Sequence, residues 1–263
     1  MKKRVISAIV MVLLFVPFLI LGGIPFTILI SILGMLAVKE ILDLEKDIPV
    51  MIKFISLVIS LFLILYNYHD LDFSLITDYR IIGCVFLLIA SSMVINGNLK
   101  KYNYKDSLWL FSIILMIGIF FNNLIHLRNI GLNIFVYIFL ISAITDTFAL
   151  FCGKRFGKSK LSPNISPNKT IEGSLGGSVF GTVISVMFYL FFIDKSANIL
   201  LLIIVTFILT IVGQLGDLFF SSIKRHHKVK DFSNLIPGHG GILDRFDSTL
   251  FVAYGYLILT LII

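Results

Sequence analysis

The sequence predicts an all-α, polytopic integral membrane protein with about nine transmembrane helices and a cytoplasmic N-terminus. Of its 263 residues, 58% are hydrophobic and only 14% are charged, and the mean hydropathy is +1.01. A soluble domain is about half apolar and a quarter charged, so this composition excludes a soluble globular protein, a disordered chain and a coiled coil. Since one span needs ~20 apolar residues, the length allows roughly eight to ten crossings joined by short loops.

The nine predicted helices are the apolar runs that contain no cluster of charged residues. Each run must be helical in hydrocarbon, because a helix satisfies its own backbone hydrogen bonds. Gly22 and Gly23 predict a tight turn after the first run, and no small-residue cleavage site follows it, so we expect a retained helix and not a signal peptide. The runs lie at about 4–21, 24–44, 50–68, 81–96, 108–125, 131–151, 175–193, 199–220 and 248–263.

The basic residues predict which side of the membrane each loop faces. With the N-terminus inside, 19 of the 22 lysines and arginines fall in cytoplasmic segments, and only Arg80, Arg128 and Lys195 face outward. Cytoplasmic loops are rich in Lys and Arg, so this distribution predicts a cytoplasmic N-terminus and an external C-terminus. Membrane topology therefore accounts for the net charge of +7, and no nucleic-acid partner is needed to explain it.

The polar residues are unevenly distributed along the chain, which predicts two regions. Residues 1–130 are nearly uniform hydrophobic runs, and we expect an N-terminal region of about five spans there. Residues 131–263 contain two long polar loops, and we expect a C-terminal catalytic region of about four spans there. Both polar loops are predicted to face the cytoplasm.

An acidic residue inside an apolar run is the first sign of a functional site. Asp146 lies well inside the sixth run. An ionised carboxylate in hydrocarbon is costly, so we expect this side chain to face a cavity, a cation or a basic partner. A purely structural pairing with one lysine on a helix is the alternative.

The polar loop after the sixth run predicts a phosphate site. Lys169 follows Pro167 and lies just before a predicted helix start, and an ammonium beside a helix N-terminus favours phosphate binding. Topology alone explains the other lysines of this loop as readily. The glycines spaced every four residues favour close helix packing over ligand contact. The polar neighbours of Lys169 are Ser166, Asn168 and Glu172, and the spaced glycines are Gly173, Gly177 and Gly181.

The strongest signal runs from Asp217, at the end of the eighth run, to Asp247, at the start of the last. Asp244 and Asp247 are three residues apart and share one face of a predicted helix start. Three such carboxylates would repel one another unless a divalent cation or basic groups offset them, and oxygen ligands suit Mg²⁺. A helix-dipole role explains either acid of the pair alone. It does not explain why Asp217, the glycine-rich segment 237–241 and a group of basic residues occur together with them. These basic residues are Lys224, Arg225 and Lys230.

These residues predict a membrane enzyme that handles phosphates at the cytoplasmic interface with Mg²⁺. No cysteine or spaced histidine pair supports a zinc site, and Cys84 and Cys152 indicate no disulfide framework. Carboxylates, lysines and a glycine-rich loop without a nucleophile–base pair suit phosphoryl or nucleotidyl transfer. A membrane transporter is the alternative class, although its polar groups would lie on broken helices at the membrane midplane.

The segment from Ser221 to Asp247 resembles the C-terminal signature of the phosphatidate cytidylyltransferases, also called CDP-diacylglycerol synthases. The shared pattern is Ser-x-apolar-Lys-Arg, then Lys-Asp, and then Pro-x-His-Gly-Gly-apolar-x-Asp-Arg-apolar-Asp. The upstream Ser-Pro-x-Lys-Thr-x-Glu-Gly at residues 166–173 is also similar to the family. Phe148 and Leu150 depart from the family pattern, at apolar positions that bear on packing.

The resemblance implies that CTP and phosphatidate react to give CDP-diacylglycerol and pyrophosphate, with Mg²⁺ and with or without a monovalent cation such as K⁺. It implies a homodimer in the bacterial inner (plasma) membrane, with the active site facing the cytoplasm. A related CTP-dependent lipid or polyprenol kinase is the alternative activity. Asp217, Asp244, Lys169 and Asp146 carry over as catalytic residues, with Asp217 and Asp244 as metal ligands and Asp247 as a weaker one. The substrate-binding residues carried over are Ser166, Asn168, Lys169, Glu172, Ser221, Lys224, Arg225, Lys230, His239, Gly240, Gly241 and Arg245.

Overall fold

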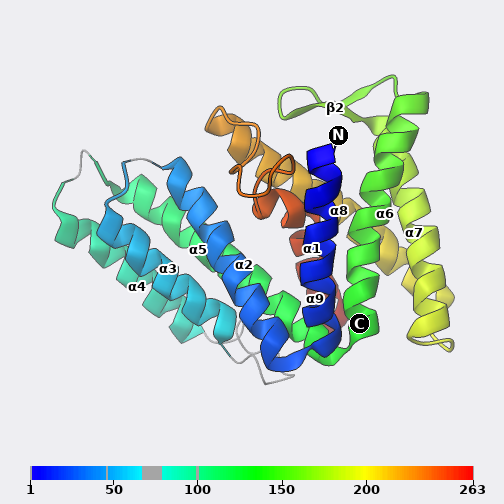
Figure 1. Ribbon diagram of the computed structural model, residues 1–263, viewed down its shortest axis with the longest axis horizontal. Helices are drawn as coiled ribbons and strands as arrows, with labels where there is room; N and C mark the ends of the chain where they lie inside the picture. Colours follow the sequence, from blue (N-terminus) through cyan, green and yellow to red (C-terminus); the bar gives the residue numbers. More distant parts are fainter. Residues whose placement is uncertain (1, 46, 67–78, 99–100, 263) are drawn as a thin grey trace. The chain divides into compact units, whose positions relative to one another are not determined.

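The computed structural model describes residues 2–45, 47–66, 79–98 and 101–262. Within these residues the chain forms nine α-helices and one two-stranded sheet (Figure 1). The prediction of an all-helical membrane protein is confirmed, because each predicted apolar run overlaps a helix; residues 67, 68 and 263 of these runs lie outside the described residues. The elements are α1 (Lys2–Leu21), α2 (Gly23–Leu44), α3 (Val50–Leu65), α4 (Tyr79–Asn96), α5 (Tyr104–Ile130), α6 (Leu132–Phe156), β1 (Lys160–Ser162), β2 (Ser166–Thr170), α7 (Ile171–Phe192), α8 (Ile199–His226) and α9 (Leu243–Ile262).

The helices have the length and surface expected of membrane spans. Six of those described are long and apolar enough to cross a membrane, namely α2, α4, α5, α6, α7 and α8, and shorter apolar helices are formed by Ile6–Leu21 and Val50–Leu65. Large apolar side chains face outward on many of them, such as Leu13 at 67% exposed and Phe54 at 66% exposed. Such surfaces suit hydrocarbon, and the chain is a multi-pass membrane protein. Its cytoplasmic N-terminus remains a prediction.

The chain folds into two compact units. Unit 1 comprises Met1–Ile130 together with Phe232–Leu243, and unit 2 comprises Gly131–Asp231 together with Asp244–Ile263. In unit 1, α5 packs against α2, α3 and α4, and in unit 2, α7 packs against α6 and α8. The residues just before α9, from Phe232 onward, therefore pack with helices from the beginning of the chain.

The predicted tight turn between α1 and α2 is confirmed and is held by an arginine of α5. Gly22 and Gly23 have φ angles of 65° and 52°, in the left-handed region that favours glycine. Arg128 donates from Nε to the carbonyl of Leu19 at 2.7 Å and from Nη2 to the carbonyl of Ile20 at 3.0 Å. These carbonyls belong to the last turn of α1, where a helix leaves its acceptors unsatisfied. A contact over more than 100 residues of sequence therefore caps the first helix.

A short hairpin replaces part of the loop expected between α6 and α7. β1 and β2 are antiparallel, with Lys160 opposite Thr170 and Ser162 opposite Ser166. Strands this short and polar have no hydrophobic alternation, so the sequence pattern did not reveal them. Thr170 then forms the N-cap of α7, because its hydroxyl accepts the N–H of Gly173 at 3.1 Å. The hairpin thus places the residue before this cap, Lys169, directly at the start of α7.

The spaced glycines of α7 allow it to lie against α6. A Cβ atom on Gly173 would lie 2.7 Å from the carbonyl oxygen of Ala149, and one on Gly177 would lie 2.6 Å from that of Thr145. Both neighbours are backbone atoms, so no side chain can move away to make room. The prediction that these glycines serve helix packing is confirmed.

We expect Gly177→Ala to destabilise the protein, because the added methyl group forces α7 away from α6. Overpacking of this kind costs about 1–3 kcal/mol. Gly83→Ala in α4 is the matched control, since a Cβ atom there meets nothing within 4 Å and alanine favours a helix over glycine. The melting temperature of the detergent-purified protein should fall for Gly177→Ala and stay equal or rise for Gly83→Ala. Equal melting temperatures for the two variants would contradict this account of the packing.

Candidate active site

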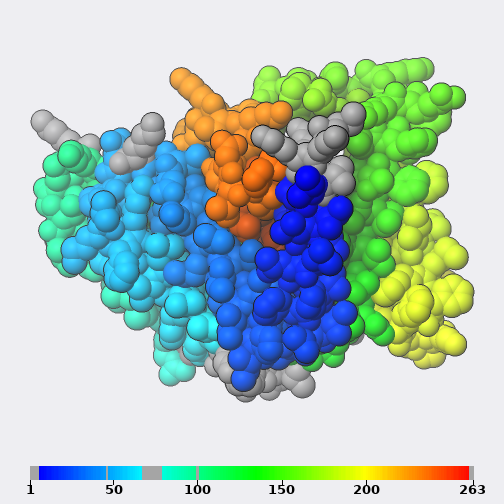
Figure 2. All heavy atoms as spheres, viewed as in Figure 1, coloured from blue at the N-terminus to red at the C-terminus, as the bar shows by residue number. Residues whose placement is uncertain are grey.

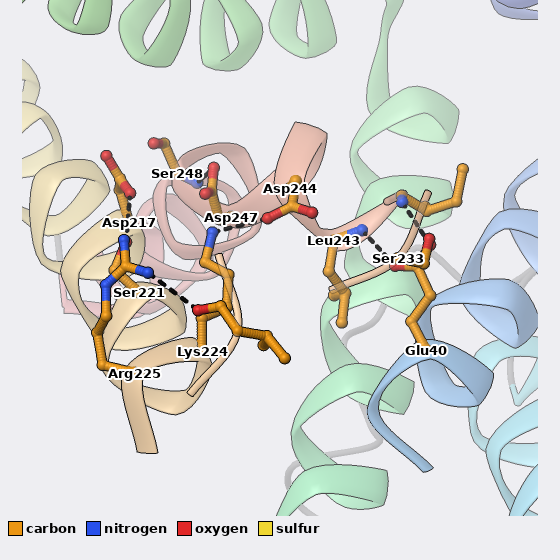
Figure 3. A network of polar contacts seen from close by, with 12 residues as sticks. Glu40, Asp217, Ser221, Lys224, Arg225, Ser233, Leu243, Asp244, Asp247 and Ser248 are labelled. Carbon is orange, nitrogen blue, oxygen red and sulfur yellow. Dashed lines mark hydrogen bonds and ion pairs between the residues drawn. The ribbon is translucent and has the colours of Figure 1, made fainter. Parts of the chain in front are cut away.

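One face of α8 carries three of the predicted site residues. The helix continues to His226, six residues beyond the predicted end of its apolar run at 220, so Asp217, Ser221 and Lys224 lie on one helix. Their spacing of four and then three residues places them on one face. The hydroxyl of Ser221 donates to Asp217 Oδ1 at 3.2 Å (Figure 3).

Asp217 forms an ion pair with Lys169, which β2 presents just before the N-cap of α7. The two side chains are 26% and 24% exposed, so this pair is accessible to a polar ligand. The structure therefore brings together two of the predicted catalytic residues, from segments 48 residues apart in the sequence. The ammonium of Lys169 lies where the sequence predicts a phosphate site, beside a helix N-terminus.

Lys224 forms the second ion pair, with Asp244 in the first turn of α9. Nζ lies 2.7 Å from Asp244 Oδ1, and the two side chains are only 9% and 3% exposed. Burying both charges is costly, and the short contact offsets that cost because each charge meets the other. This pair joins the end of α8 to the start of α9 (Figure 3).

A glycine of α8 lets α9 approach closely at this level. A Cβ atom on Gly216 would lie 2.6 Å from the ring of Phe251 and 2.8 Å from the carbonyl oxygen of Asp247. Asp247 itself accepts the N–H of Ser248 at 2.8 Å, and its carboxylate interacts electrostatically with Asp217. Sequence reasoning missed the role of Gly216, which its position directly before Asp217 could have suggested.

Asp146 joins the same group from α6. Its Oδ2 accepts a hydrogen bond from the Ser248 hydroxyl at 3.1 Å, and it interacts electrostatically with both Asp217 and Lys169. The expectation of a cavity, a cation or a basic partner is met by the nearby positive charge of Lys169. We call the six charged residues of this group the aspartate–lysine cluster, which consists of Asp146, Lys169, Asp217, Lys224, Asp244 and Asp247.

The aspartate–lysine cluster has the donor chemistry for a divalent cation. Its carboxyl groups outnumber its ammonium groups by two, and carboxylate oxygen is the ligand that Mg²⁺ prefers. Among the residues that the structure describes, no three or more His, Cys, Asp or Glu side chains converge as a ready-made metal site. Mg²⁺ needs no such cage, because it usually takes one or two protein carboxylates and completes its shell with water and substrate phosphates. The residues present therefore fit the cation.

The glycine-rich segment 236–241, here called the glycine loop, forms a compact turn. Ile236 and Gly240 exchange backbone hydrogen bonds of 2.8 and 3.1 Å. Gly238 and Gly240 have φ angles of 79° and 88°, so a side chain at either position would be strained. This part of unit 1 therefore has a defined backbone, in which the N–H groups of His239 and Gly240 both donate to the carbonyl of Ile236.

The predicted ligand His239 contacts the first helix. Its Nδ1 lies 2.8 Å from the hydroxyl of Ser7 in α1, and the same hydroxyl donates to the carbonyl of Pro237 at 3.0 Å. In Figure 2 the loop, in orange, lies next to α1, in dark blue. The resemblance carries His239 over as a substrate-binding residue, and the structure gives it a hydrogen bond with Ser7. Its contact with phosphate remains a prediction.

An acid that the sequence did not single out holds the end of the same segment. Glu40 of α2 accepts hydrogen bonds from the N–H groups of Ile242 and Leu243 and from the hydroxyl of Ser233 (Figure 3). Its position inside an apolar run was a visible signal, because a carboxylate there requires partners. It lies near the end of the predicted span, where charged residues are common, so its position alone does not mark it as a site residue.

The other predicted substrate-binding residues lie outside the aspartate–lysine cluster. Glu172 accepts the N–H groups of Lys158 and Ser159 at 3.0 and 3.2 Å, which ties the segment after α6 to the start of α7. Arg225 donates to the carbonyls of Ile165 and Val229. Their roles toward substrate remain predictions, as do those of the paired strand residue Ser166 and of the exposed Asn168, Lys230 and Arg245.

Comparison with known proteins identifies the family. The model of the cytidylyltransferase family matches residues 2–263. The chain belongs to the cytidylyltransferase family. It is 38% identical over 257 residues to phosphatidate cytidylyltransferases of Staphylococcus aureus (strain COL) and Staphylococcus haemolyticus (strain JCSC1435), with 96% of each chain covered. A phosphatidate cytidylyltransferase of Staphylococcus epidermidis (strain ATCC 35984) is 36% identical over the same length.

The match extends the resemblance found in the sequence. The motifs at residues 166–173 and 221–247 indicated the family from the second half of the chain, whereas the comparison covers nearly all of it. The sequence-based identification as a nucleotidyltransferase is thereby confirmed. In this cytidylyltransferase, the charged motif residues belong to unit 2, while the glycine loop belongs to unit 1.

We expect Lys224→Met to destabilise this cytidylyltransferase more than Lys169→Met does. Methionine keeps much of the apolar stem but removes the charge, so Asp244 is left buried beside an apolar group. Breaking a buried pair in this way costs about 3–5 kcal/mol, whereas exposed pairs contribute ~0–1 kcal/mol. Thermal unfolding of the two purified variants measures the difference. An equal fall in melting temperature would show that burial does not distinguish the two pairs.

Proposed function

We propose that the chain transfers the cytidylyl group of CTP to phosphatidate at the aspartate–lysine cluster, giving CDP-diacylglycerol and pyrophosphate. The observation that carries the proposal is the pair of Lys–Asp contacts, Lys169 with Asp217 and Lys224 with Asp244. They gather cationic and anionic side chains at one place in a chain that is otherwise strongly apolar. Relatives that cover 96% of the chain carry the name of this activity.

The main obstacle to the reaction is repulsion between two polyanions. A phosphate oxygen of phosphatidate attacks the α-phosphorus of CTP, and the bond to pyrophosphate breaks. The attacking phosphate is already anionic near neutral pH, so it needs little general-base assistance. The ammonium groups of Lys169 and Lys224 can turn from their aspartates toward substrate phosphates, where fixed positive charge lowers the barrier.

Mg²⁺ would be held by Asp217 and Asp244, with Asp247 as a weaker ligand. When bound, the cation supplies positive charge to the phosphates of CTP and to the departing pyrophosphate. Asp146 then accepts the Ser248 hydroxyl from the side of α6, and its negative charge attracts Lys169. We assign no role to the exposed basic residues Lys230 and Arg245 beyond drawing anionic substrate toward the site.

A membrane location suits a lipid substrate. The acyl chains of phosphatidate can remain in the bilayer while the head group reaches the polar cluster. We place the protein in the inner (plasma) membrane with the cluster facing the cytoplasm, where CTP is present, and expect it to act as a homodimer. A reporter enzyme that is active only outside the cytoplasm, fused after residue 263, should be active. Activity only from a cytoplasmic reporter at that position would refute the nine-span orientation.

Product analysis tests the proposed reaction. Purified protein is incubated with CTP labelled in the cytidine, phosphatidate and Mg²⁺, and the label is followed into the lipid phase. We expect a lipid that carries cytidine, together with free pyrophosphate. Release of CDP with a newly phosphorylated lipid would instead identify the CTP-dependent kinase activity.

In this assay we expect Asp217→Asn and Asp244→Asn each to lower turnover by about 10²–10³, or ~3–4 kcal/mol of barrier. Each change keeps the shape and removes one charge and one candidate ligand. A charge that only favours a helix end contributes ~0.3–1 kcal/mol and would leave turnover nearly intact. Asp194→Asn is the control, because this exposed residue lies after α7 and bonds Ser196.

Turnover is counted per folded, membrane-inserted molecule, since loss of a buried partner also lowers stability. The Asp194→Asn control should keep wild-type activity. The metal assignment is wrong if both Asp217→Asn and Asp244→Asn retain more than about a third of wild-type turnover at saturating Mg²⁺, which is less than ~1 kcal/mol of barrier.

A further inference from the structure

Glu40 is a buried acid whose carboxylate is held by three hydrogen bonds. The residue is 5% exposed on α2. Oε1 accepts the Ser233 hydroxyl at 2.7 Å and the N–H of Ile242 at 2.8 Å, and Oε2 accepts the N–H of Leu243 at 3.0 Å (Figure 3). All of these partners lie in the segment Phe232–Leu243, which contains the glycine loop.

The two backbone donors lie at the start of α9. A helix leaves its first N–H groups without partners inside the helix, and an adjacent residue such as Ser or Asp usually accepts them. Here a side chain 202 residues away in the sequence accepts them instead. A negative charge at a helix N-terminus is also electrostatically favourable. Glu40 therefore supplies the acceptor for the backbone N–H groups at which α9 begins.

Position 241 requires glycine because the carboxylate of Glu40 occupies the space that any side chain there would need. A Cβ atom at position 241 would approach both carboxylate oxygens of Glu40 to 2.5 Å. The carboxylate cannot swing aside without losing its three hydrogen bonds. Gly238 and Gly240 are required by their left-handed backbone, but Gly241 is outside that region, so its requirement is one of space.

We infer that Glu40 is a positioning residue for the cytidylyl-transfer site. It fixes the backbone that follows the glycine loop, and the residue immediately after Leu243 is Asp244, a candidate metal ligand and the partner of Lys224. A loop released from Glu40 would leave the chain direction into Asp244 undefined. This inference rests on the proposed function, because Asp244 matters to the reaction only if the aspartate–lysine cluster performs it.

The first test compares Glu40→Gln with Asp43→Asn. Glutamine has the size of glutamate but loses the charge, and its amide nitrogen cannot accept a backbone N–H. Asp43 lies on the same helix, is 61% exposed and is 4.0 Å from Lys53, so it serves as the matched control. Hydrogen bonds to a charged group contribute enough that we expect Glu40→Gln to lower turnover per folded molecule about 10- to 100-fold.

The dependence on Mg²⁺ separates positioning from mere stabilisation. If Glu40 only stabilises the fold, folded Glu40→Gln molecules should have wild-type turnover and the wild-type Mg²⁺ midpoint. If it positions Asp244, the Mg²⁺ concentration for half-maximal activity should rise several-fold, while Asp43→Asn changes neither quantity. Turnover within about threefold of wild type and an unchanged Mg²⁺ midpoint would overturn the inference.

The second test measures the contact without an activity assay. Thermal unfolding is recorded for the wild type, Glu40→Ala, Gly241→Ala and the double variant. Gly241→Ala should lower the melting temperature strongly in the wild-type background and little in the Glu40→Ala background, because the space is then empty. Equal effects in both backgrounds would overturn the contact. If the wild type makes no cytidine-bearing lipid, the proposed function fails, and this cycle alone decides whether Glu40 holds the loop.

Discussion

A charge buried among apolar helices persists only where an opposite charge or several hydrogen-bond donors hold it. In this protein that constraint determines where the polar segments lie. Lys224 and Asp244 neutralise each other at 9% and 3% exposure, and Glu40 accepts backbone donors that no local residue satisfies. Arg128 makes the converse contact with the free carbonyls of α1. Each charged group thereby fixes a turn or a helix end that apolar packing alone would leave undefined.

The same constraint bears on the chemistry proposed for the aspartate–lysine cluster. The aspartate–lysine cluster contains no nucleophile and base in the arrangement of a hydrolase, and nucleotidyl transfer needs neither, because both substrates supply the reacting groups. What the reaction needs is charge that is already in position when the phosphates arrive. In the structure, Asp217 and Asp244 hold the two lysines in place. The resting ion pairs thus keep Lys169 and Lys224 ordered without a phosphate ligand.

Local patterns in the sequence predicted the features that depend on the spacing of residues within one segment. Apolar runs located the helices, Gly177 indicated close packing, and the three-residue interval between Asp244 and Asp247 placed both at one helix start. The resemblance of residues 221–247 to a known signature indicated the family, and the family match then covered residues 2–263. The cation and the roles of individual site residues remain predictions.

Contacts between distant segments could not be predicted in this way. Glu40 with Ile242, Ser7 with His239 and Arg128 with Leu19 each join residues more than 100 positions apart. The spacing of residues within one segment does not specify which residues of a distant segment it will contact. The β1–β2 hairpin was missed for a different reason, because its few polar residues carry no hydrophobic period.

The distance in sequence between Glu40 and its partners has a consequence for biosynthesis. Ribosomes add about 5–20 residues per second, so the 202 residues that separate Glu40 from Ile242 take roughly 10–40 s to translate. During that interval α2 contains an acid whose final hydrogen-bond donors have not yet been made. A nascent chain that stops before residue 242 lacks both backbone donors and has at most the Ser233 hydroxyl. Unit 1 therefore reaches its final form only when synthesis has nearly reached the last helix, although most of its residues are among the first to leave the ribosome.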